Sequence, residues 1–102
     1  MAEQTKETKA KMEEGVVYIG IKPFMNYINA VTRQMNNGRK EVTLKSRGKS
    51  ISRCVDIAES YAKKFSNGTV KVEKITSGSE DFTNKEGKQI TISTIEIELK
   101  RV

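Results

Sequence analysis

The sequence contains no histidine and no tryptophan, and it has one cysteine, one proline and six aromatic residues. Without histidine, the chain lacks the commonest general acid–base group and the commonest zinc ligand, and a single cysteine cannot supply a thiolate cluster. We therefore expect no catalytic residues, no metal site and no cofactor. Cys54 has no partner for an internal disulfide, which is typical of a reducing cytosol, and its apolar neighbours predict a buried core side chain.

Long apolar segments are also missing. No run of about 18 apolar residues and no signal-peptide pattern occurs, so the sequence predicts a soluble, cytoplasmic protein with no membrane partner. The length of 102 residues with 35% hydrophobic content predicts one domain with a modest core. A core of this size favours association with a second subunit.

Positive charge is in excess, with 19 lysine and arginine residues against 13 aspartate and glutamate residues, a net charge of +6. The segment 1–14, MAEQTKETKAKMEE, is polar and carries three lysines and four glutamates, so we predict a disordered tail. The remaining 15–102 segment then forms the folded domain with a net charge of +7. This charge predicts a polyanionic partner, with nucleic acid first.

The first half of the domain reads as strand, helix, strand. The apolar run 16–19 between glycines predicts a strand, and Pro23 suits the start of a helix that Asn36-Asn37-Gly38 ends. Alternation over 39–46 predicts a second strand. Ser50 is a preferred N-cap for a second helix, whose predicted apolar stripe contains Ile51, Cys54, Val55, Ala58, Ala62 and Phe65, and which Ser66-Asn67-Gly68 ends.

The last third of the sequence predicts a long hairpin. The alternation that begins at Val70 slips by one residue before Ile75, and the alternation that begins at Ile90 slips by one before Ile95. Two slips at matching heights predict a bulge or a strong twist, beyond which residues 74–93 project from the body by about 25 Å. Because isolated hairpins are marginal in water, the projecting part is expected to bind a partner.

The turn of this hairpin is predicted at Asn84-Lys85-Glu86-Gly87, where glycine can adopt a positive φ. The predicted element order is therefore β-α-β-α-β-β. This order is typical of an α/β fold, a two-layer sandwich with both helices on one face of the sheet and a long protruding C-terminal β-hairpin.

The segment 45–53, KSRGKSISR, resembles part of a nucleotide-binding P-loop. The P-loop pattern requires a glycine five residues before Gly48, but Thr43 occupies that position, so we reject an NTPase site. A basic loop at the start of a helix nevertheless attracts phosphates. Between Lys22 and Arg53 there are eight basic residues and one acidic residue, a density that favours a repeating polyanion.

Three segments of the chain, VYIGIKPFMNYINAV, KSRGKSISRCVDIAE and STIEIELKR, carry a family resemblance. They are similar to the Alba family of archaeal chromatin proteins, from about Val16 to the C-terminus. The fold that this implies resembles the C-terminal domain of translation initiation factor three. The resemblance also implies a homodimer, associated with the chromosome (the nucleoid) in the cytoplasm, that binds double-stranded DNA and often RNA with little sequence preference.

The resemblance assigns roles by position. In the family, two basic loops on the central face of the dimer contact phosphates, the hairpins reach along the minor groove, and a phenylalanine late in the second helix joins dimers on DNA. The corresponding residues here are Lys22, Lys45, Arg47, Lys49 and Arg53 on the central face, Lys85 and Lys88 on the hairpin, and Phe65 between dimers.

Two departures from the family pattern bear on function. The family commonly has two lysines before the proline, the first an acetylation target, and Ile21 replaces that lysine here. The hairpin also carries Glu80, Asp81 and Glu86, which give residues 80–88 a net charge of −1. Phosphates repel these carboxylates, so we expect weaker coating of bulk DNA than is usual in the family, or a preference for particular sites or for RNA.

Chromatin protein is thus the first hypothesis for function. The alternative is an RNA-binding structural subunit of a ribonucleoprotein such as an RNase P-like particle. An enzyme comes third, because the P-loop glycine and histidine are both missing. Affinities for duplex DNA and structured RNA at equal salt distinguish the first two hypotheses.

Overall fold

The computed structural model describes residues 15–102. It confirms the predicted element order and the α/β class, while the predicted tail, residues 1–14, lies outside the described residues. No helix of the described part is long and apolar enough to span a membrane. The elements are β1 (Val16–Tyr18), α2 (Phe24–Asn36), β2 (Glu41–Arg47), η1 (Gly48–Ser50), α3 (Ile51–Ser60), η2 (Tyr61–Phe65), β3 (Val70–Thr83) and β4 (Gln89–Arg101).

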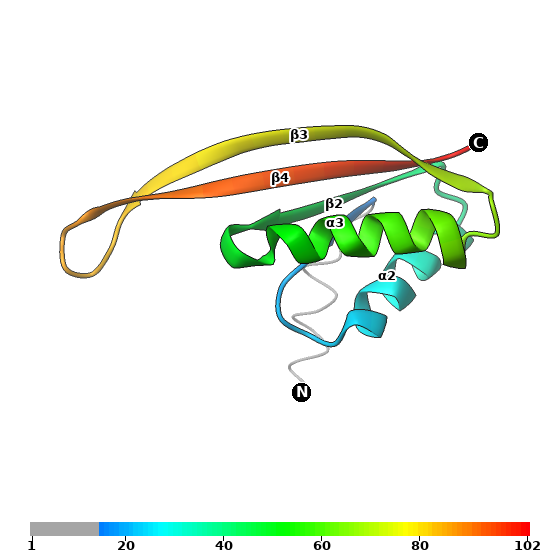
Figure 1. Cartoon of the computed structure of the whole chain (residues 1–102), viewed down its shortest axis with the longest axis horizontal. Coiled ribbons are helices and arrows are strands. Elements are labelled where there is room, and N and C mark those ends of the chain that lie inside the picture. Colours follow the sequence, from blue (N-terminus) through cyan, green and yellow to red (C-terminus); the bar gives the residue numbers. More distant parts are fainter. Residues whose placement is uncertain (1–14) are drawn as a thin grey trace.

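The four strands form one sheet in the order β1-β2-β4-β3. β1 is parallel to β2, with Val17 opposite Leu44, whereas β4 is antiparallel to both β2 and β3, with Ile97 opposite Leu44. Both helices cover the same face of this sheet, as predicted (Figure 1). The other face carries no helix among the described elements, so side chains that point to it are exposed or half-buried.

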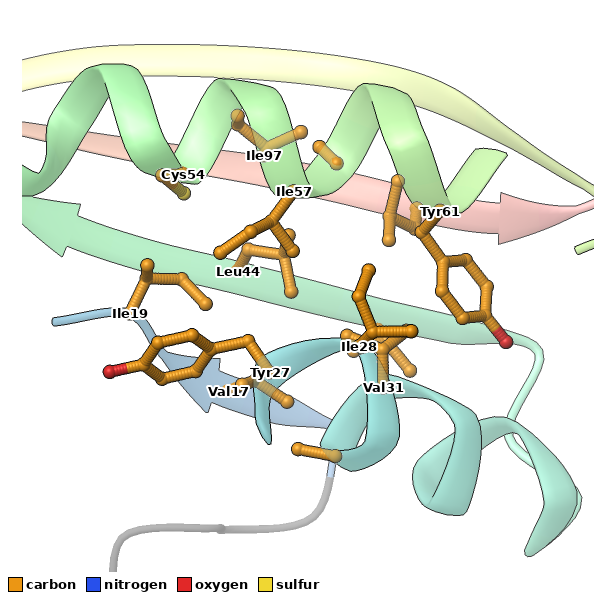
Figure 2. Close-up of a cluster of buried hydrophobic side chains, with 14 of the residues drawn as sticks. Val17, Ile19, Tyr27, Ile28, Val31, Leu44, Cys54, Ile57, Tyr61 and Ile97 are labelled. Atoms are coloured by element: carbon orange, nitrogen blue, oxygen red, sulfur yellow. The ribbon is translucent and has the colours of Figure 1, made fainter. Parts of the chain in front are cut away.

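The core lies between the helices and the covered face of the sheet. In β2 the side chains of Val42, Leu44 and Ser46 are buried and those between them are not, as the alternation predicted. Figure 2 shows Leu44 and Ile97 from the sheet packed against Cys54 and Ile57 from α3. The hydroxyl groups of both tyrosines, Tyr27 and Tyr61, lie at the margin of this cluster.

The start of α3 differs from the prediction. Ser50 immediately precedes the helix, but its side chain makes no capping hydrogen bond. Its φ of −90° and ψ of 2° lie outside the extended region that a capping serine normally adopts. Instead, Gly48–Ser50 form a 3₁₀ turn that leads directly into the helix.

The end of this helix also differs from the prediction. The backbone N–H of Ser66 donates to the carbonyl of Tyr61 over 2.8 Å, which makes η2 a π turn with one extra residue. This extra residue rotates the following side chains away from the 3.6-residue stripe. Phe65, which the predicted stripe included, is therefore 44% exposed. Tyr61, which the stripe omitted, is buried because it lies four residues after Ile57 and three after Ala58, on the face that α3 already buries.

Of the two irregularities expected in the hairpin, the structure confirms the one on β3. The register of β3 shifts between Val72 and Lys74, so Glu73 forms a bulge there. On β4 the prediction was wrong, because its pairing with β3 continues without a break from Ile92 to Ile95. Ile95 is buried on the face that the helices cover, and Ile92 points to the uncovered face, because residues three apart in a regular strand lie on opposite faces. No helix lies over the sheet beyond that point (Figure 1).

The hairpin projects from the body, as predicted, but over a shorter segment than 74–93. β2 supports β4 as far as the pair formed by Arg47 and Thr94, and Gly78 lies opposite Thr94 on β3. We call the unsupported segment, residues 79–93, the arm (Figure 1). Its turn has the predicted Gly87 at a φ of 81°, in the left-handed region that favours glycine.

Candidate nucleic-acid interface

The Lys22 loop, residues 19–23 between β1 and α2, is held from two sides. The phenol oxygen of Tyr27 accepts hydrogen bonds from the backbone N–H groups of Gly20 at 2.9 Å and Lys22 at 3.0 Å. From the other side, the Arg53 guanidinium on α3 donates to the Lys22 carbonyl at 2.6 Å. These bonds fix the backbone and leave the Lys22 side chain exposed to solvent.

The Gly48 loop, residues 47–50 between β2 and α3, lies next to it. Gly48 has a φ of 62°, a conformation that an L side chain adopts only with strain, so glycine suits the sharp turn from strand to helix. Ser46, immediately before this loop, donates from its buried hydroxyl to the Ile19 carbonyl over 3.1 Å. Two loops that are separated by more than twenty residues in sequence are thereby held at one end of the domain.

Arg53 has a mixed environment. One guanidinium nitrogen donates to the Lys22 carbonyl, while its Nε is buried without a hydrogen-bond partner among residues 15–102. Burial of this donor without a partner costs free energy. The hydrogen bond to the Lys22 carbonyl and the packing of the side chain offset that cost and hold the side chain in place. This geometry makes Arg53 a positioning residue for Lys22, and its predicted phosphate contact stays a prediction.

Lys45 and Arg47 point to the uncovered face of the sheet, where each meets a carboxylate. Lys45 Nζ lies 3.7 Å from Glu96 Oε2, and an Arg47 guanidinium nitrogen lies 3.1 Å from Glu80 Oε1. All four side chains are at least one-third exposed, and such surface pairs contribute on the order of 0–1 kcal/mol. A phosphate can therefore replace either carboxylate at low cost.

The predicted site residues fall into separate groups in space. The exposed side chains of Lys22 and Lys49 lie on the two adjacent loops, with Lys45 and Arg47 on the neighbouring strand. The turn between β3 and β4, which contains Lys85 and Lys88, forms the tip of the arm far from these loops, and the end of η2, which contains Phe65, lies at the opposite end of the molecule (Figure 1). A single copy thus does not unite these three groups, and their assigned roles stay predictions.

A groove of about 310 Å³ was not predicted from the sequence. Arg47, Glu80, Asp81, Phe82 and Ile92 line it, where the Gly48 loop meets the base of the arm. The slip in alternation after Ile92 was the available signal, because it marked the residue at which apolar side chains move to the uncovered face. Within residues 15–102, no group of three potential metal ligands occurs.

Comparison with known proteins identifies the family. The sequence model described as Alba matches residues 15–79, which is more than half of the chain. The chain belongs to the Alba family. A curated relative from Methanocella arvoryzae, "DNA/RNA-binding protein Alba", is 44% identical over 89 residues, which cover 87% of this chain and 92% of the relative.

Solved structures of Alba proteins agree with the fold. Alba from Thermoplasma volcanium superposes with a TM-score of 0.76 at 40% sequence identity, covering 84% of this chain and 99% of the other. An Alba protein from Trypanosoma brucei gives a TM-score of 0.69 at 20% identity, covering 87% and 70%. The second likeness concerns the fold alone.

Proposed function

We propose that this Alba-family chain binds nucleic acid through the phosphate backbone, with double-stranded DNA as the main target and RNA as a second one. The observation that carries the proposal is the hydrogen bond from Arg53 to the Lys22 carbonyl, which joins the exposed Lys22 loop to α3, directly after the exposed Gly48 loop. The name of the Methanocella relative and the family's nucleic-acid-binding character support it. No enzymatic activity is proposed.

The mechanism is neutralisation of phosphates. Lys22 and Lys49 extend into solvent from rigid backbone, and Arg47 exchanges Glu80 for a phosphate oxygen. Each phosphate contact releases condensed counterions, which provides affinity without selecting a sequence. Because loops fixed by hydrogen bonds lose little entropy on binding, the geometry favours this exchange.

We further propose a homodimer that acts in archaeal chromatin in the cytoplasm, with the arms along the minor groove and Phe65 between dimers. The archaeal relatives support this role. Ile75 supports dimerisation, because it is 52% exposed on the helix-facing side of the edge strand β3. Sedimentation equilibrium should give twice the chain mass at micromolar concentration, and a stable monomer would refute the dimer.

The experiment that tests the target is a titration of duplex DNA and of a structured RNA of equal length at the same salt concentration. We expect duplex DNA to bind with affinity at least equal to that of the RNA. A strong preference for the RNA would favour the second candidate, a structural subunit of a ribonucleoprotein. The carboxylates on the arm favour that candidate, because they oppose entry into a groove walled by phosphates.

A further inference from the structure

The groove at the base of the arm lies on the face of the sheet that no described helix covers. Strand register lays its side chains there in successive rows, because residues opposite each other in a sheet share a face. The rows are Arg47 with Thr94, then Glu80 with Ile92, then Phe82 with Ile90. A cation, a carboxylate and an aromatic ring therefore follow one another along the groove of about 310 Å³.

The carboxylates of the groove differ in what they contact. Asp81 pairs with Thr91 in the register, so its side chain lies on the opposite face of the arm from Glu80, where it accepts a hydrogen bond from the Thr91 hydroxyl at 2.6 Å. Glu80 contacts Arg47 at 3.1 Å, and the two side chains are 57% and 66% exposed. A ligand can therefore reach Glu80 as a hydrogen-bond acceptor, provided that an anionic group of the ligand takes the place of the Glu80 carboxylate as the partner of Arg47.

The aromatic ring next to this pair is also accessible. Phe82 is 42% exposed, and the half-buried Ile92 beside it provides an apolar floor. Flat bases stack on exposed aromatic side chains, guanidinium groups bind phosphate, and carboxylates accept hydrogen bonds from the amino group of cytosine. One nucleotide combines all three complementary groups.

We propose that this groove binds an unpaired nucleotide whose base has an exocyclic amino group, with cytosine preferred. The phosphate binds Arg47, the released Glu80 carboxylate accepts from the cytosine N4 amino group, and the base stacks on Phe82. Bases inside a duplex cannot lie on the ring, so single strands, bulges and loops are the targets. The inference rests on the proposed function and adds base selectivity to backbone affinity.

The test compares short single-stranded oligocytidine and oligouridine, which differ at position 4 of the base in presenting an amino donor or a carbonyl acceptor. Fluorescence anisotropy of the full chain, at one low salt concentration and a pH slightly above neutral, gives both affinities. We expect oligocytidine to bind about five-fold more tightly than oligouridine. Glu80→Gln should bring this ratio close to one, because the amide both donates and accepts.

Glu86→Gln is the matched control, since it removes one negative charge from the arm at its turn, away from Arg47. It should raise both affinities slightly and leave their ratio unchanged. Phe82→Leu retains apolar bulk without a π face, and it should weaken both oligonucleotides by about five-fold. The ratio separates base recognition from general electrostatics.

Three results would overturn the inference: equal or tighter binding of oligouridine by the unsubstituted protein, the same change of ratio in Glu80→Gln and Glu86→Gln, or unaltered oligocytidine binding in Phe82→Leu. Duplex DNA measured in the same assay distinguishes the two proposals. Duplex binding without cytosine selectivity refutes the groove alone, whereas failure to bind any of the nucleic acids refutes the proposed function as well.

Discussion

Single side chains decide the shape of the Lys22 loop, and the Tyr27 hydroxyl is the clearest case. It accepts hydrogen bonds from the backbone N–H groups of Gly20 and Lys22, and the hydrophobic core buries the rest of the ring. Tyr27→Phe leaves both donors without this acceptor while keeping the apolar volume. Because unpaired partly buried donors are costly, we expect the free energy of unfolding in urea to fall by about 1–3 kcal/mol.

Tyr61→Phe is the control for this substitution. Tyr61 is also buried, but its hydroxyl makes no hydrogen bond among residues 15–102. Loss of the Tyr61 hydroxyl should change the free energy of unfolding by less than about 0.5 kcal/mol. Equal effects of the two substitutions would contradict the role of Tyr27 in holding the loop.

Cys54 gives a prediction for alkaline pH. Burial raises the pKa of its thiol to about 12, because the apolar core disfavours the thiolate. The unfolded chain loses this proton near pH 9, so the contribution to stability is complete below pH 9 and is lost as pH rises toward 12. Between these limits the unfolding free energy should fall by up to about 1.4 kcal/mol per pH unit.

Cys54→Ala removes this titration and leaves every other ionisable group of the chain in place. Urea unfolding of both proteins at pH 8 and pH 10 provides the measurement. The alanine variant should be less stable at pH 8, because a small cavity replaces sulfur, and the difference should narrow at pH 10. A difference that stays constant would show that the thiol titrates alike in both states.

The sequence predicted which segments carry basic side chains, but it did not predict which residues those side chains contact. The positive charge of Lys22, Arg47 and Lys49 follows from their amino-acid types alone. The pair of Arg47 with Glu80 depends on the register between strands 33 residues apart, which no local pattern encodes. The sequence showed that acids on the arm oppose phosphate, but it did not show which basic side chain they neutralise.

At the scale of the elements, the π turn η2 is the feature with the clearest consequence. It moves Phe65 to the surface, so Phe65→Ala should lower the free energy of unfolding by less than about 1 kcal/mol. Ile57→Ala, at a fully buried position of the same helix, should cost about 2–5 kcal/mol. Thermal and urea unfolding of both variants provide the comparison.

The same Phe65 substitution tests association on DNA. Binding of a short duplex should be nearly unchanged, whereas cooperative coverage of long DNA, measured by gel shift, should weaken. This expectation follows from the family position of Phe65 and from its exposure. Unaltered cooperativity would exclude Phe65 from contacts between dimers, and a large loss of stability would show that it is a core residue.

The sequence predicted the end of α2 and the turn of the hairpin correctly, because backbone conformation alone determines where they lie. Gly38 and Gly87 both have positive φ at the predicted ends. The predictions failed where tertiary packing intervenes. The π turn inserts a residue and moves Phe65 out of the apolar stripe, and the apolar residues of β4 change face where the helical layer ends (Figure 1).

At the scale of the whole molecule, binding should depend steeply on salt. Three or four cations per subunit, from Lys22, Lys45, Arg47 and Lys49, give about six to eight phosphate contacts per dimer, and a log–log salt slope of roughly −5 to −7 on B-DNA. Replacing Arg47 and Lys49 together with alanine removes four contacts per dimer. The slope should then become shallower by about 3–4.

Duplexes of unrelated sequence serve as the control, because phosphate contacts are common to all of them and the loss should be similar. An unchanged slope in the double variant would refute phosphate binding by the Gly48 loop. ATP should have no effect beyond ionic strength. ATP hydrolysis that depends on Lys49 would instead restore the rejected P-loop hypothesis.

The position of β4 in the sheet has a consequence for how the protein is made. The strand that completes the sheet between β2 and β3 follows both of them in the chain. Until a ribosome has synthesised β4, β2 has only the three-residue β1 as a partner, and β3 has none. Because a ribosome adds about 5–20 residues per second, β2 and β3 have unpaired backbone edges for seconds before β4 is synthesised. The fold therefore forms late in synthesis, and a nascent chain that stalls before β4 exposes strands prone to aggregation.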